Sequence, residues 1–257
     1  MSGPVAIDEL RAAYRAVQEG VFRTVTVPVA QAAPAKTSPE GQAVWEPSGR
    51  VLLVAGCMGS AGASTIALAL ATSAGDARVV ECCTVASSGL CGATSAELGT
   101  VNGWVSGRRD LVVIERRGDR IASLANMPIP APSGKPITVL DSSFDIDVLA
   151  ADDGWLGEVF RTAPLVVLVT RGTFPGLRRL DAAVELAGAE RSVAVVIGVG
   201  KRWPKALAQA LTPALRRLRT ADRLVSVPTA SVLALGGLTP DPLPTAVMAA
   251  AADIVNH

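Results

Sequence analysis

Aromatic residues are scarce in this sequence of 257 residues: they make up 4% of it, although 49% of the residues are hydrophobic. Ala, Val and Leu must therefore fill the core, and such small side chains favour helices packed closely on a sheet. With only 18% charged residues, the composition does not resemble that of a disordered chain. The length is enough for one large α/β domain or two small ones.

Residues that bind metals or carry out acid–base chemistry are also few. The only histidine is His257, which leaves no internal histidine for either task. The four cysteines, Cys57, Cys82, Cys83 and Cys91, form no C-x-x-C pair. Three of them are expected near the carboxyl ends of the first two strands, so a redox or metal role stays open beside the commoner role of apolar filler. We expect reduced thiols and no metal site.

Charge and hydropathy give no sign of a membrane protein. The net charge of +1 favours neither nucleic acid nor an acidic partner. No uninterrupted apolar run approaches 18 residues, and the first 20 residues lack the apolar centre of a signal peptide. The C-terminal TAVMAAAADIVNH has no Lys or Arg to attract it to anionic lipid. We expect a cytoplasmic protein without membrane insertion.

The chain divides into three parts by pattern. Residues 1–25 are expected to hold an amphipathic helix, and residues 26–49 form a linker rich in Pro and Ala. Residues 50–257 are expected to form an α/β domain. The apolar residues of the helix recur at helical spacing and are Ile7, Leu10, Tyr14, Val17 and Val21.

Short apolar runs alternate with helical patterns along the third part. This alternation predicts a mostly parallel, twisted sheet with helices on both faces. One segment departs from it: residues 111–124 are expected to form a β-hairpin insertion that turns at Arg117-Gly118-Asp119. The predicted strands are 51–55, 78–83, 137–141, 165–170, 193–199 and 224–227.

The stretch VLLVAGCMGSAGASTIALALA (51–71) has the layout of a phosphate-binding loop: an apolar strand, a glycine-rich turn, then a helix. Such a loop points backbone N–H groups at a phosphate, and the helix dipole adds favourable potential. Gly59 and Gly62 supply the flexible backbone, and Ser64 or Thr65 opens the helix. Because the lysine of such loops is missing, a tight strand-to-helix connection stays open as the alternative.

This loop resembles that of the ParA/MinD family of deviant-Walker ATPases, which typically reads K-G-G-x-G-K-T-T. The order of later segments is also similar, over roughly residues 50 to 255. When MGSAGAST is placed against that motif, Met58 and Ala63 stand at the two lysine positions. The resemblance implies a P-loop NTPase fold of ParA/MinD type with a degenerate Walker A loop. The resemblance implies a nucleotide loop that is either vestigial or binds weakly. Its residues are Gly59, Ser60, Gly62, Ala63, Ser64 and Thr65.

Of two further landmarks of the family, the Walker B aspartate is present, and the acidic residue after the second strand is replaced. KPITVLDSSFDI resembles the Walker B strand and places Asp141 where an aspartate bonds to Mg²⁺ through water or to the loop hydroxyl; a helix N-cap or turn residue is the alternative. After the second strand, Cys83 and Thr84 stand where the family has an acidic residue and a proline. The family's first switch segment begins at that acidic residue. Glu81 is near, but alternation along the strand places it beside this switch and not at it. The resemblance thus implies no catalytic residue.

A basic segment near the C-terminal end is a candidate for DNA contact. Residues 201–223 contain seven Lys or Arg against one acid. Relatives of ParA type bind DNA non-specifically through such residues, whereas a solvated helix face is the ordinary interpretation. The seven are Lys201, Arg202, Lys205, Arg216, Arg217, Arg219 and Arg223.

The sequence therefore predicts a non-catalytic relative of these ATPases. We expect a pseudo-ATPase without a cofactor, a binding or scaffold protein of plasmid or chromosome partition or of conjugative transfer, with an unidentified protein partner and scope for a homodimer. One alternative is a slow or partner-activated ATPase that binds ATP or ADP with Mg²⁺ and in which Arg171 or Arg202 replaces the missing lysines. Another is a DNA-binding accessory protein. The composition, rich in Ala, Arg and Val with few Lys, is typical of a high-GC bacterium.

Overall fold

The computed structural model describes residue 15 and residues 45–257. The predicted N-terminal helix and most of the predicted linker therefore lie outside the described residues. Within residues 45–257, no helix has the combination of length and apolar character that crossing a bilayer requires.

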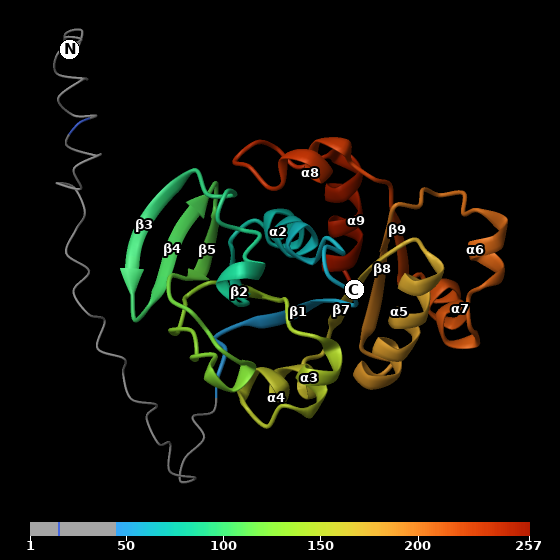
Figure 1. The fold of residues 1–257 in the computed structure, drawn as a ribbon, viewed down its shortest axis with the longest axis horizontal. Helices are drawn as coiled ribbons and strands as arrows, with labels where there is room; N and C mark the ends of the chain where they lie inside the picture. The colour runs from blue at the N-terminus through green and yellow to red at the C-terminus, as the bar shows by residue number, and fades with distance from the viewer. Residues whose placement is uncertain (1–14, 16–44) are drawn as a thin grey trace, which may run out of the picture. The chain divides into compact units, whose positions relative to one another are not determined.

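A sheet of nine strands runs through the described domain (Figure 1), in the order β3-β4-β5-β2-β6-β1-β7-β8-β9. From β5 to β9 all neighbours are parallel, whereas β4 is antiparallel to both β3 and β5. The six predicted strands all form, each within two residues of the predicted ends. The bounds are β1 Arg50–Gly56, β2 Ala77–Cys82, β3 Ala96–Val101, β4 Trp104–Arg109, β5 Val112–Arg117, β6 Ile137–Ser142, β7 Val166–Arg171, β8 Ser192–Ile197 and β9 Leu224–Val227.

Helices cover both faces of the sheet (Figure 1), which confirms the predicted fold class. Alanine-rich α2 and α9 pack against each other on one face, so small side chains do allow the close packing that the composition indicates. The other face is covered by α3, α4, α5 and α7. The helices are α2 Ala63–Ala74, α3 Ile146–Ala151, α4 Trp155–Thr162, α5 Phe174–Ala187, α6 Lys205–Gln209, α7 Pro213–Thr220, α8 Ser231–Gly236 and α9 Thr245–Val255.

The predicted hairpin is displaced along the chain. Its two strands are β4 and β5, and the turn lies at Asp110-Leu111, where Asp110 has a φ of 52°. After β5 the chain leaves the sheet, because the other edge of β5 already pairs with β2. At the expected turn, Arg117 instead forms an ion pair with Asp119 and lies over the Trp104 ring at 4.8 Å. The expectation of a hairpin over 111–124 was therefore wrong in its position.

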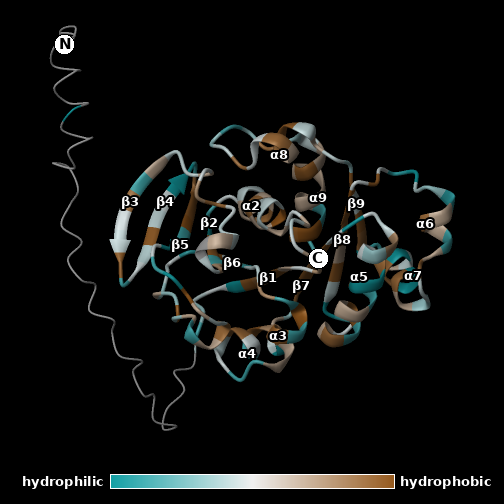
Figure 2. Cartoon of the chain, in the orientation of Figure 1, coloured by the Kyte–Doolittle hydropathy of each residue, from teal (hydrophilic) through white to brown (hydrophobic). Residues whose placement is uncertain are grey.

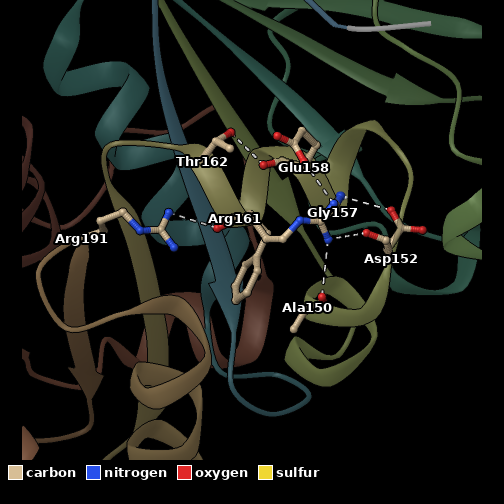
Figure 3. A network of polar contacts seen from close by, with 8 residues as sticks. Ala150, Asp152, Gly157, Glu158, Arg161, Thr162 and Arg191 are labelled. Atoms are coloured by element: carbon tan, nitrogen blue, oxygen red, sulfur yellow. Dashed lines mark hydrogen bonds and ion pairs between the residues drawn. The ribbon is translucent and has the colours of Figure 1, made fainter. Parts of the chain in front are cut away.

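Polar contacts fix the ends of α4 on the second face (Figure 3). Arg161 donates to the Asp152 carbonyl at 2.6 Å and pairs with Glu158 at 3.1 Å. The Gly157 N–H donates to the Asp152 side chain at 3.1 Å, and Arg191 donates to two carbonyls at the end of the helix. These bonds satisfy backbone groups that a helix terminus leaves free. They hold α4 in the helix layer on this face of the sheet.

Candidate functional site

A cleft with a volume of about 620 Å³ opens at the carboxyl ends of the parallel strands. Ligands of open α/β sheets bind at this edge. Its walls come from the loop after β1, the segment 86–89 after β2, the end of β6 and the segment after β9. The structure brings together here all the predicted loop residues and the Walker B-like residue, namely Gly59, Ser60, Gly62, Ala63, Ser64, Thr65 and Asp141.

The loop between β1 and α2 presents an uncapped helix start to this cleft. Gly62 precedes the helix with a φ of 98°, and a Cβ there would lie 2.6 Å from the Ile197 Cδ1 atom, so glycine is required. No side chain caps α2, and its first turn carries no acidic residue. The first N–H groups of a helix lack intrahelical partners, and the dipole there favours an anion.

Neither lysine position carries a charge. Met58 packs against the apolar core, and Ala63 is the first residue of α2. The loop thus offers backbone donors and a helix dipole to an anion, but no cation of its own.

Asp141 is the buried acid of the cleft. Its side chain is 2% exposed, and its Oδ1 atom has no hydrogen-bond partner. Burial and the neighbouring Glu81 raise the pKa of this carboxyl to about 7, while a hydrogen bond with Ser64 acts in the opposite direction. When Asp141 is ionised, its Oδ1 atom thus has no partner, and no cation among the described residues forms an ion pair with it.

Glu81 organises the segment after β2. It lies opposite Asp141 in the register of β2 and β6 and is 1% exposed. Its carboxylate accepts bonds from the Ser88 hydroxyl at 2.7 Å and from the backbone N–H groups of Gly89 and Leu90 at 2.6 and 2.9 Å. The expectation that Glu81 lies merely beside the switch is thus corrected, because the chain folds back over the strand end and is tied to this carboxylate.

That segment lies against the start of α2. A Cβ on Gly89 would be 2.9 Å from the Ser64 Oγ atom, so only glycine fits there without displacement. An acid within a fully buried strand needs bonding partners. This is the signal by which the sequence could have indicated the role of Glu81.

The three cysteines near the cleft have raised thiol pKa values; Cys82 and Cys83 are buried, and Cys57 is partly buried. Cys83, at the position of the family's acidic residue, is 3% exposed, and burial together with Glu81 and Asp141 raises the pKa of its thiol. Burial also raises the pKa of Cys57 to about 12 and that of Cys82 well above its usual value. In the part of the chain that the structure describes, no three His, Cys, Asp or Glu side chains gather as metal ligands would. A thiol held in this state is no base for water.

Arg171 brings a positive charge to the cleft from outside the loop. It ends β7, and its Nε and Nη2 atoms donate to the Ser60 carbonyl at 3.1 and 2.9 Å. Among the described residues that line the cleft, it is the one Lys or Arg, and Arg202 is not among them. Of the two arginines that the sequence offers as replacements, the structure places only Arg171 at the loop.

The basic segment forms a separate surface around α6 and α7. Six of its seven side chains are exposed, and the seventh, Arg223, donates to the Glu190 carbonyl. Figure 2 shows hydrophilic residues gathered on α5 and α7. Within residues 45–257, none of the seven forms an ion pair, and none lines the cleft.

Comparisons with known proteins place the fold. No family model matches the chain, and no curated protein matches it. Among solved structures, MinD from Pyrococcus furiosus is similar with a TM-score of 0.54 and 13% identity over 81% of this chain and 97% of that one. A Borrelia burgdorferi protein described as a plasmid partition protein, bound to AMPPNP, gives 0.52 and 14% over 82% and 98%.

A third solved structure agrees with these two. A variant of McdA from Cyanothece in complex with ATP gives a TM-score of 0.52 and 11% identity over 82% of this chain and 96% of that one. At such identities the likeness concerns the fold and not the chemistry. The chain has the α/β fold of ParA- and MinD-type ATPases.

Proposed function

We propose that this protein binds a nucleoside polyphosphate together with a divalent cation in the cleft, does not hydrolyse it, and serves as a binding or scaffold protein. One observation carries the proposal: the buried, unpartnered Oδ1 atom of Asp141, next to Ser64 and the uncapped start of α2. A structural turn has no need of a buried, uncompensated carboxylate, since such a group costs stability.

The residues present fit Mg²⁺ with a phosphate chain. Asp141 and the hydroxyl of Ser64 are oxygen donors of the kind that Mg²⁺ takes, directly or through water. The first N–H groups of α2 and the loop backbone suit phosphate oxygens. When bound, the cation supplies charge compensation both for the phosphates and for Asp141.

The same residues argue against hydrolysis. Attack by water on a phosphate needs a group that orients or deprotonates the water and charges that stabilise the transition state. Cys83 is a protonated thiol, and the carboxylate of Glu81 is occupied by three hydrogen bonds. Met58 and Ala63 provide no charge in the loop. At the position of the family's acidic residue, the described part of the cleft thus has no group that activates water, although the cleft has means to bind a nucleotide.

The biological setting is inferred from the fold. Similar structures include proteins described as plasmid partition proteins and MinD, and one of them is a MinC:MinD complex, in which the fold holds a protein partner. This supports a role in plasmid or chromosome partition with a protein partner. Conjugative transfer and formation of a homodimer are further parts of the proposal.

Calorimetric titration of the purified protein with Mg-ATP and Mg-ADP tests the proposal. We expect saturable binding of both nucleotides and release of phosphate no faster than in buffer. Absence of heat at millimolar nucleotide, for folded protein freed of co-purified nucleotide, would reduce the loop to a tight connection. Steady release of phosphate would support the slow ATPase instead.

The basic surface supports a second function, contact with DNA. Its exposed arginines have no ion-pair partner among the described residues, as a phosphate-binding surface requires. The triple variant Arg216→Gln, Arg217→Gln, Arg219→Gln should weaken binding to arbitrary duplex DNA. In a salt titration, the slope of log K against log salt should fall by about one for each DNA phosphate that the variant no longer binds. Arg120→Gln, an exposed arginine outside residues 201–223, is the control and should not weaken binding. Failure of the unchanged protein to bind DNA at low salt would exclude this function.

A further inference from the structure

Arg171 approaches the phosphate loop from the neighbouring strand. We infer that its guanidinium group binds the phosphate chain of the ligand in this cleft and so takes the task of the missing loop lysine. The inference rests on the proposed function, since it assigns a contact within the same site. Its basis is the position, the free donors and the unpaired charge of this side chain.

The backbone of Arg171 is held firmly at the edge of the cleft. β7 is the parallel neighbour of β1, so its end lies beside the start of the loop. The next residue, Gly172, donates its N–H to the Ile197 carbonyl at 2.8 Å, and Thr173 caps α5 through its side chain. A cation that is positioned in advance loses less entropy when it binds a ligand.

The guanidinium group still has capacity for an anion. Arginine has five N–H donors, and the described contacts use those of Nε and Nη2 on a single oxygen, the Ser60 carbonyl. None of the described carboxylates forms an ion pair with Arg171. Phosphate oxygens accept stronger hydrogen bonds from a guanidinium group than a neutral carbonyl does.

Binding of phosphate in this way also involves the loop. Ser60 has a φ of 56°, a left-handed conformation that is uncommon for a residue with a side chain, and Arg171 is bonded to its carbonyl. When the free donors of the guanidinium group bind a phosphate, Arg171 joins the ligand to the Ser60 carbonyl. Arg171 therefore links occupation of the cleft to the conformation of the loop.

Arg171→Gln tests this assignment, because glutamine keeps a donor but loses the charge and the fork of the guanidinium group. By calorimetry we expect this variant to bind Mg-ADP and Mg-ATP about 10- to 100-fold more weakly. Arg171→Lys keeps only the charge, so its nucleotide affinity should lie between those of the unchanged protein and Arg171→Gln. Arg202→Gln, exposed and outside the cleft, should bind as the unchanged protein does.

A second readout separates phosphate contact from a structural role. In ¹H–¹⁵N spectra of arginine side chains, the Nε–H signal that disappears in Arg171→Gln should shift on addition of Mg-ADP, and the melting temperature without ligand should stay close to that of the unchanged protein. Equal affinity of the unchanged protein and Arg171→Gln would overturn the inference and leave the proposed function intact. Absence of nucleotide binding by the unchanged protein would overturn both.

Discussion

Asp141→Asn should make the folded protein more stable at pH 8, by ~1–4 kcal/mol. The pKa of the buried carboxyl is about 7 instead of 3.8. Ionising it at pH 8 therefore costs up to ~4 kcal/mol relative to the unfolded chain. Asparagine has nearly the same shape and carries no charge, so the variant avoids this cost. In thermal unfolding, the melting temperature should rise by at least about 2 °C.

The pH dependence of this effect has a definite sign. Between about pH 4 and pH 7, Asp141 holds a proton in the folded protein but not in the unfolded chain, as the two pKa values require. Stability of the unchanged protein therefore falls as the pH rises through this window and stays low above it. The advantage of Asp141→Asn should accordingly be largest at pH 8 and should vanish near pH 4.

An exposed acid and a metal titration serve as controls. Asp253→Asn changes a solvent-exposed carboxylate on α9 and should shift stability by less than about 0.5 kcal/mol. Millimolar Mg²⁺ at pH 8 should stabilise the unchanged protein but not Asp141→Asn, because the cation compensates the carboxylate. If Asp141→Asn were less stable than the unchanged protein at pH 8, the charge of Asp141 would be satisfied within the fold, and the cation site would lose its main support.

The central strands could be predicted because both of their faces are buried. β1, β2, β6, β7 and β8 are covered by helices on both sides and so appear in the sequence as nearly continuous apolar runs. The antiparallel extension gives no such signal. β3 is exposed along its whole length, and β4 includes Ser106, Gly107 and Arg108. The register of β4 depends on its pairing with β5, and no local sequence pattern encodes that pairing. The hairpin was therefore predicted too late in the chain.

The site was predictable where it is local in sequence. The glycine pattern predicted the loop, and the end of the apolar run 137–141 predicted Asp141. Arg171 and Ser60 are 111 residues apart, and only the parallel pairing of β1 and β7 brings them together. The bonds of Glu81 to the segment after β2 likewise depend on how that segment folds back, which alternation along a strand does not determine.

Ala63→Lys should raise the affinity for Mg-ATP and Mg-ADP by about 10- to 100-fold, the range expected for one charge-assisted hydrogen bond to phosphate. Ala63 is the first residue of α2 and lines the cleft, so a longer side chain there can extend towards the ligand. A cation at a helix N-terminus opposes the dipole and should lower stability without ligand by ~0.3–1 kcal/mol. Ala221→Lys, at the exposed end of α7, controls for added charge alone.

Turnover should not return with the lysine. Cys83 and the fully bonded Glu81 still provide no group that activates water, so phosphate release by Ala63→Lys should remain at the level of buffer. If the variant hydrolysed ATP, the missing lysines alone would explain the loss of activity. In the Ala63→Lys background, the further substitution Arg171→Gln should reduce the affinity by a smaller factor than it does in the unchanged protein, because both cations act on the same phosphates. Independent, additive effects of the two substitutions would instead place them on different parts of the ligand.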